Sequence, residues 1–306
     1  MLPLIRIPDS FAQTLRIGTC SWKYDSWKGL IYDQGKTYQP YDYLSDYVQY
    51  FNTVEIDQWF WSLFPTGVKL PSPGVVQRYS DSVPDDFRFS IKAPNAITLT
   101  HYYTKQPKNA QHLANQPNPY FLDTEILERF LETLEPARSK LGPIMFQFEY
   151  LNKQKMPSLQ AFVDILGAFF DRAPKGYHYA VESRNPNYQK DPFFALLKGQ
   201  HVSCVLLEGY YMPPIGEITP KCDVLTGNAL VVRLHGPDRS KIEKRTKSIW
   251  NEIVEPRESS LSSAAGIIKA SVSKESDIYV NVNNHYEGCA PLTIQRLMER
   301  HPWPTG

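Results

Sequence analysis

The sequence predicts an α/β fold, a TIM-type (β/α)8 barrel formed by a single domain. Eight short apolar or alternating segments are typical of strands, and helical apolar patterns lie between several of them. A doubly wound open sheet would show the same alternation, but no GxGxxG motif follows the first strand. The pattern therefore favours the barrel.

The predicted strands cover residues 15–19, 52–57, 87–92, 143–148, 177–182, 201–207, 230–235 and 277–282. Asp123 is positioned to cap a helix whose apolar side chains recur every three or four residues, and Gly142 with Pro143 ends that helix region. A second helix begins at Pro157–Ser158, and weaker helical patterns fit residues 41–51, 74–81, 192–198, 260–272 and 292–300.

The wide gaps after the third and seventh strands predict loop insertions near residues 94–120 and 236–258. Residues 1–14 are interpreted as an N-terminal extension, and residues 15–306 as the barrel domain.

Composition narrows the class of protein. Of the 306 residues, 42% are hydrophobic and 21% charged, which excludes a mostly disordered chain. The net charge of +1 argues against a globally basic nucleic-acid-binding protein. No apolar stretch approaches the roughly 18–20 residues that span a bilayer, and the N-terminus does not resemble a signal peptide. Four scattered cysteines form neither a zinc signature nor a disulfide framework, so we expect reduced thiols in the cytoplasm.

Alternation within the strands predicts which side chains enter the barrel. In the third strand Phe87, Phe89 and Ile91 share one phase, which we expect to face the helices. The opposite phase should then point into the barrel, and its late positions are polar. Because barrel enzymes place their chemistry at the carboxyl ends of the strands, these positions predict a functional pocket. They are Glu55, Asp57, Lys92, Gln147, Glu182, Arg184, Arg233, His235 and Asn283, from six strands.

Seven ordered segments carry a family resemblance: IGTCSWKYDSWKGLIY (17–32), FNTVEID (51–57), FRFSIKAP (87–94), LGPIMFQF (141–148), AVESR (180–184), VVRLHG (231–236) and YVNVNNHYEGCAP (279–291). Together they resemble the YecE-like family, a domain of unknown function numbered 72, over about residues 15–300. The resemblance implies a TIM-type barrel with a polar pocket at the strand ends, and a distant similarity to endonuclease-IV-like and xylose-isomerase-like barrels. It implies no particular reaction. Residues 60–75 and 102–120 match it poorly.

Glu55 and Glu182 are the candidate catalytic acid and base, and His235 is a candidate general base. The alternative is a structural ion network, in which Glu55 pairs with Lys92 and Glu182 pairs with an arginine. Cys20 is interpreted as a small buried residue rather than a reactive thiol.

The candidate substrate-binding residues are partly cationic. Arginine forks suit carboxylate and phosphate groups, which predicts an anionic ligand, although the same cations could simply neutralise the nearby carboxylates. Trp22 and Trp27, just after the first strand, are candidate stacking platforms; Trp59 and Trp61 follow the second strand. The alternative is that the tryptophans pack in the core. The candidate set is Lys92, Gln147, Arg184, Arg233, Asn283, Trp22 and Trp27.

A divalent metal such as Mg²⁺ or Mn²⁺ is a further possibility, with Glu55, Asp57, Glu182 and His235 as ligands. Against it, the first strand has no HxH pair and no HExxH motif occurs. The basic segment 238–247 follows the seventh strand, where barrels often bind phosphate, but such a run is also typical of a solvated surface.

The leading functional hypothesis is a hydrolase- or lyase-type enzyme that acts on a polar, anionic substrate bearing phosphate or carboxylate. Three further hypotheses stay open on the sequence alone. They are a nucleic-acid-binding protein or endonuclease-IV-like phosphoesterase, a carbohydrate-active enzyme, and a non-catalytic protein that binds a small molecule.

Overall fold

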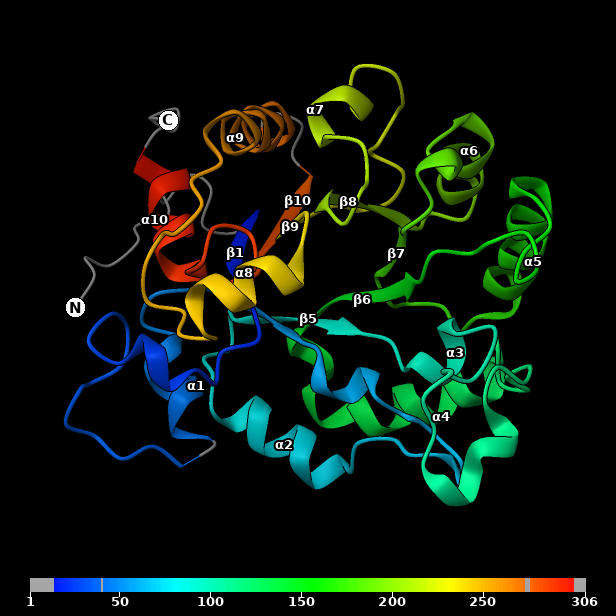
Figure 1. Cartoon of the computed structure of the whole chain (residues 1–306), viewed down its shortest axis with the longest axis horizontal. Coiled ribbons are helices and arrows are strands. Elements are labelled where there is room, and N and C mark those ends of the chain that lie inside the picture. Colours follow the sequence, from blue (N-terminus) through cyan, green and yellow to red (C-terminus); the bar gives the residue numbers. More distant parts are fainter. Residues whose placement is uncertain (1–13, 40, 273–275, 300–306) are drawn as a thin grey trace.

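The centre of the molecule is a closed barrel of parallel strands (Figure 1). The computed structural model describes residues 14–39, 41–272 and 276–299. Around the barrel the strands follow the order β1, β10, β9, β8, β7, β6, β5, β2, so consecutive barrel strands are neighbours. Their bounds are Leu15–Cys20 (β1), Thr53–Ile56 (β2), Arg88–Lys92 (β5), Leu141–Phe148 (β6), Tyr179–Ser183 (β7), Ser203–Gly209 (β8), Ala229–Gly236 (β9) and Asp277–Val282 (β10).

Most helices lie around the strands in Figure 1, whereas α8 (Arg239–Thr246) overlaps them in this view. A two-stranded hairpin, β3 (Leu63–Phe64) and β4 (Gly67–Val68), follows β2. The helices are α1 (Asp42–Tyr47), α2 (Pro73–Asp81), α3 (Asn95–Thr98), α4 (Thr124–Leu134), α5 (Leu159–Arg172), α6 (Asp191–Gly199), α7 (Ile215–Ile218), α8 (Arg239–Thr246), α9 (Glu258–Val272) and α10 (Ala290–Glu299). Within the described ranges, no helix has both the length and the apolar character to cross a bilayer.

The predicted barrel is confirmed, since every predicted strand segment overlaps a barrel strand. Some local expectations differ, and the insertion expected near residues 94–120 contains α3. The helix expected over residues 41–51 ends at Tyr47, because the N–H groups of Gln49 and Tyr50 bond the carbonyls three residues earlier and tighten the chain into a turn. The segment 236–258, expected as a loop, contains α8, whose first turn is capped by Asp238. The expected N-terminal extension lies outside the described residues except for residue 14.

A thin apolar layer fills the barrel beneath the carboxyl ends of its strands. The side chains that face the helices, including Phe87, Phe89 and Ile91, belong instead to the large outer core, as the alternation predicts. This apolar layer lies beneath the polar groups and separates them from the rest of the barrel interior. It consists of Met145, Ala180, Val205, Ala229, Val231 and Tyr279.

The first turn of helix α4 is stabilised by the side chain of Asp123, and this contribution is directly testable. The Asp123 carboxylate accepts hydrogen bonds from the N–H groups of Glu125 (2.8 Å) and Ile126 (3.2 Å). We expect Asp123→Ala to lower the free energy of unfolding by about 1 kcal/mol, because two helix N–H groups lose their acceptor. Urea unfolding measures the change, and Asp123→Asn, which keeps an acceptor oxygen, should retain most of the stability. Equal losses in the two variants would contradict this explanation.

Candidate functional site

The polar side chains predicted at the strand ends surround one cavity of about 480 Å³. It opens at the carboxyl ends of the barrel strands, above the apolar layer. Glu182 is the exception among the predicted polar residues, since it is buried just behind the arginines that line the cavity. The predicted residues that line it are Glu55, Asp57, Lys92, Gln147, Arg184, Arg233, His235 and Asn283.

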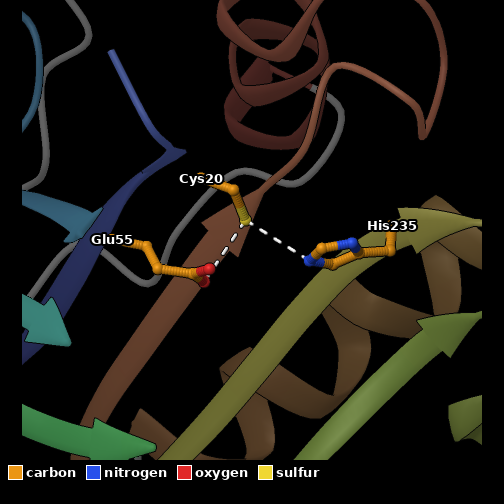
Figure 2. Close-up of side chains that lie close together, drawn as sticks. All are labelled: Cys20, Glu55 and His235. Atoms are coloured by element: carbon orange, nitrogen blue, oxygen red, sulfur yellow. Dashed lines mark hydrogen bonds between the residues drawn. The ribbon is translucent and has the colours of Figure 1, made fainter. Parts of the chain in front are cut away.

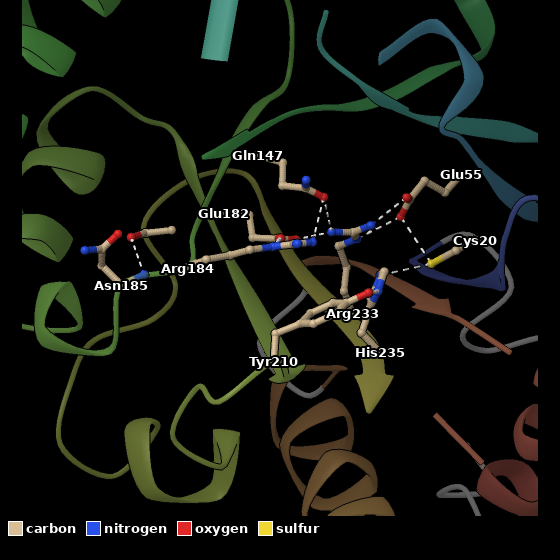
Figure 3. A network of polar contacts seen from close by, with 10 residues as sticks. Cys20, Glu55, Gln147, Glu182, Arg184, Asn185, Tyr210, Arg233 and His235 are labelled. Atoms are coloured by element: carbon tan, nitrogen blue, oxygen red, sulfur yellow. Dashed lines mark hydrogen bonds and ion pairs between the residues drawn. The ribbon is translucent and has the colours of Figure 1, made fainter. Parts of the chain in front are cut away.

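Arg233 is the centre of a buried ion network (Figure 3). Its Nε and Nη2 donate to the two oxygens of Glu55 at 2.8 and 2.6 Å, and its Nη1 donates to Glu182 and, at 3.2 Å, to Gln147. The side chains of Arg233, Glu55 and Glu182 are each only 1% exposed. Burial would lower the pKa of Arg233, but the charges of Glu182 and Glu55 outweigh it and raise that pKa.

Glu182 also holds Arg184. The Arg184 Nε donates to Glu182 at 2.8 Å, its Nη2 donates to Gln147 at 2.9 Å, and its guanidinium lies 4.3 Å from the centre of the Tyr210 ring. Burial favours the neutral acid, but Arg233 and Arg184 outweigh burial and lower the pKa of Glu182 to about 2. A carboxylate that stays ionised at neutral pH is a poor general acid, so its placement supports a positioning role for Glu182 instead.

Cys20, Glu55 and His235 form a second cluster beside this network (Figure 2). The Cys20 thiol donates to Glu55 at 3.4 Å and lies 3.5 Å from His235 Nε2. Burial and the Glu55 charge raise the pKa of Cys20 well above its usual value. Burial and the nearby charge of Arg233 lower the pKa of His235 well below its usual value. The thiol and the imidazole are therefore both neutral at neutral pH.

This cluster, rather than the predicted set of four ligands, is where a metal would fit. One donor atom each from Cys20, Glu55 and His235 lies within 4.8 Å of the others, and thiolate, carboxylate and imidazole are zinc ligands. Glu182 is committed to two arginines, which removes it from the expected set. Metal binding here requires loss of the Cys20 proton and competition with Arg233 for the Glu55 oxygens.

Lys92 does not pair with Glu55, as the structural alternative required, because Arg233 occupies both oxygens of that carboxylate. The Lys92 Nζ lies 3.9 Å from the centre of the Phe60 ring. Burial and the Arg233 charge lower the pKa of Lys92 to about 8. Burial and Glu55 raise the pKa of Asp57, which lines the same cavity.

Trp22 and Trp27, the candidate stacking platforms, follow the alternative and pack in the core. Trp22 and Trp27 are 0% exposed, belong to the hydrophobic core and do not line the cavity. Their rings pack on Tyr79 and Tyr24, so they present no free face to a ligand. Trp61, in contrast, lines the cavity and is 58% exposed. The aromatic residues that line the cavity are Tyr24, Phe60, Trp61, Tyr103 and Tyr210.

Tyr210 owes its position to a close approach of two strand ends. Gly209 and Gly236 have φ angles of 138° and 73°, and a Cβ on Gly209 would lie 2.2 Å from the Gly236 oxygen. The next residue, Tyr210, has a φ of 51°. Its hydroxyl consequently lies 3.2 Å from His235 Nδ1 and its ring lies over Arg184. Tyr210 thus orients both a candidate base and a candidate anion-binding group.

The basic segment after β9 is largely neutralised by its neighbours. Arg239 lines the cavity and pairs with Glu243 at 2.8 Å, whereas Lys241 and Arg245 pair with Glu255. Only Arg239 therefore brings the charge of this segment to the cavity among the described residues.

Comparison with known proteins agrees with the fold. Residues 16–304 match the profile of a family described as "Protein of unknown function DUF72". The chain belongs to the DUF72 family. Two curated relatives, the UPF0759 proteins YecE of Escherichia coli K12 and O157:H7, are each 25% identical over 173 residues, which is 56% of this chain. The match spans about half (49%) of the length of these relatives.

Solved DUF72 structures share the architecture. A DUF72 protein from Thermotoga maritima is 20% identical, with a TM-score of 0.64 over 94% of this chain and 98% of that one. Another from Enterococcus faecalis is 20% identical, with a TM-score of 0.60 over 93% of this chain and 95% of that one. At this level of identity the likeness establishes the DUF72 fold alone.

Several cavity residues of this DUF72 chain are not among the residues predicted from the sequence. From the sequence, Cys20 is interpreted only as a buried residue, and Tyr210 and Tyr103 are not named as candidates. For Tyr210 a signal exists, because it lies just beyond the sixth predicted strand, at the end where the other polar groups collect. For Tyr103 none exists, since it lies in the poorly matched segment 102–120 and reaches the cavity only through the tertiary fold.

Proposed function

We propose that this protein is a hydrolase- or lyase-type enzyme that acts on a small polar substrate bearing a phosphate or carboxylate group. One observation carries the anionic part of the proposal. Within the described chain, Lys92 Nζ and Arg184 Nη1 have no hydrogen-bond acceptor, although both side chains line the cavity. Cationic donors without a protein acceptor suit an anionic ligand.

The acid and base roles follow from the protonation states of the lining groups. His235 is neutral at neutral pH and is oriented by Tyr210, so it is suited to accept a proton from the substrate. We assign the proton-donor role to Asp57, a carboxyl group that lines the cavity and whose pKa is raised mainly by burial. Glu55 and Glu182 hold Arg233 and Arg184 in place, and Gln147 accepts hydrogen bonds from both arginines.

Anion binding tests the proposal directly. We expect inorganic phosphate to bind the wild-type protein, and Arg184→Met to weaken binding at least about tenfold, because a charge-assisted hydrogen bond is lost. Isothermal titration calorimetry measures the dissociation constants. Arg129→Met, on the exposed face of α4, is the matched control and should leave binding unchanged. Equal phosphate affinity in the two variants would remove Arg184 from the binding site.

A second candidate, metal-assisted hydrolysis, is favoured specifically by the Cys20–Glu55–His235 cluster. Its test is a titration with Co²⁺, in which a Cys20 thiolate ligand produces a sulfur-to-metal charge-transfer band. That band should disappear in Cys20→Ser. A wild-type spectrum without the band would leave proton transfer by His235 as the better explanation.

A carbohydrate-active enzyme and a nucleic-acid-binding protein fit the geometry less well. A glycosidase needs two carboxyl groups with room for the sugar between them, whereas Glu55 and Glu182 bind the same Arg233. A nucleic-acid interface needs unpaired surface cations, whereas Lys241 and Arg245 are paired with Glu255. Both features favour a small anionic substrate.

A further inference from the structure

Among the described cavity residues, Lys92 differs from Arg184 because no part of its charged group is held by a protein acceptor. It is the last residue of β5, it is half-buried, and its Nζ lies against the face of the Phe60 ring. Among the described residues this amine has no hydrogen bond and no ion pair. Lysines that serve only to hold a structure together have acceptors, as Lys140 does in the carbonyls of Ser80 and Val83.

Burial favours the neutral form of Lys92. Among the neighbouring charges, Arg233 and Arg184 disfavour a further positive charge, whereas Glu55 and Glu182 favour it. Burial is the largest influence, and the resulting pKa of about 8 leaves roughly a tenth of the amine unprotonated at pH 7. An ordinary exposed lysine, with a pKa near ~10.4, has less than about a thousandth in that form.

We propose that Lys92 is a nucleophile that forms a Schiff base with an aldehyde or ketone carrying a carboxylate or phosphate group. The anionic part of this substrate rests on the function proposed above, with Arg184 holding the anion. An amine that is desolvated and adjacent to other cations is the usual arrangement for Schiff-base chemistry. The site would then belong to a lyase rather than a hydrolase.

The chemistry balances with the groups that line the cavity. The neutral amine attacks the carbonyl carbon and a C–N bond forms. The carbonyl oxygen then takes up two protons, one from the amine and one from an acid, and leaves as water, so that an iminium ion remains. Asp57 lines the same cavity as Lys92, and in this step its carboxyl group supplies the second of these protons. In a lyase step, a C–C bond next to the iminium breaks and its electron pair forms an enamine. His235 accepts the hydroxyl proton of the departing fragment. Protonation of the enamine and hydrolysis by water then release Lys92.

Reductive trapping tests this assignment. The probe is glyoxylate, an aldehyde bearing a carboxylate, added with cyanoborohydride, which converts an imine into a stable secondary amine. Peptide mass spectrometry then compares Lys92 with the exposed Lys105 in the same sample. We expect Lys92 to be modified at least about tenfold faster than Lys105 at pH 7. We also expect its rate to reach half its maximum near pH 8. Modification of Lys92 no faster than of Lys105 would overturn the Schiff-base assignment.

Two comparisons separate this inference from the proposed function. Arg184→Met should lower the rate of Lys92 modification by glyoxylate more than the rate by glycolaldehyde, which has no carboxylate. Loss of the Arg184 charge alone slows both reactions, because it makes Lys92 easier to protonate. Inorganic phosphate should protect Lys92 in the wild-type protein. If phosphate binds while Lys92 remains unmodified, the Schiff base is wrong and anion binding stands. If Lys92 is trapped rapidly without any effect of phosphate or of Arg184, the Schiff base stands and the anion site is wrong.

Discussion

Arg233→Met is expected to lower the free energy of unfolding by about 3–5 kcal/mol. The variant fills similar space but leaves the Glu55 and Glu182 carboxylates, each 1% exposed, without the guanidinium that neutralises them. Removing one partner of a buried ion pair is costly because the remaining charge is neither solvated nor paired. Urea unfolding at pH 7 measures the loss.

The controls separate charge from geometry. Arg233→Lys keeps the positive charge but lacks the fork that binds two carboxylates, so we expect an intermediate loss. Arg245→Met removes the exposed arginine of a surface pair with Glu255 and should cost less than about 1 kcal/mol. If Arg233→Met does not fold, adding Glu55→Gln and Glu182→Gln should restore folding, because neither partner of Arg233 then carries an unpaired buried charge. A loss in Arg233→Met as small as that in Arg245→Met would contradict the buried network.

Glu182 should make the protein sensitive to acid. Its pKa is about 2 in the folded state and about 4.3 in an unfolded chain, so ionised Glu182 stabilises the folded state above pH ~4.3. This stabilisation is lost as the pH falls from about 4.3 towards 2. A shift of this size corresponds to about 3 kcal/mol. Glu182→Gln lacks the titration, so its stability should fall less over this pH window than that of the wild type.

Urea unfolding of both proteins between pH 6 and pH 3 provides the measurement. We expect the stability curves to converge as the pH falls, because the wild type loses an interaction that the variant does not have. Parallel curves would show that Glu182 titrates normally in the folded state. Glu149→Gln is a suitable control, since Glu149 is a partly exposed carboxylate at the same end of the barrel.

Much of the barrel is predictable from local patterns. Phe87, Phe89 and Ile91 alternate with polar residues because successive side chains of a strand point to opposite faces, and that period is visible in the sequence alone. Asp123 likewise indicates the start of α4 from its neighbours along the chain. The same alternation places Lys92 at the site, since polar residues at strand ends meet at one mouth of a barrel.

Partners within the site are not predictable in this way. The sequence indicates that Glu55 meets a cation but points to Lys92, whereas Arg233, 178 residues away, reaches both of its oxygens. Trp22, a candidate stacking platform, lies in the core, which is the alternative that the sequence left open. Cys20 is buried as expected, and the structure adds that it lines the cavity.

The sequence by itself determined the barrel, the phase of its strands and the collection of polar residues at their carboxyl ends, because these depend on interactions between near neighbours and on the period of a strand. Only the tertiary structure decided which carboxylate pairs with which cation. It also decided that Lys92 has no hydrogen-bond partner among the described residues and that His235 is neutral. Those properties depend on distances and burial between residues that are far apart in the chain.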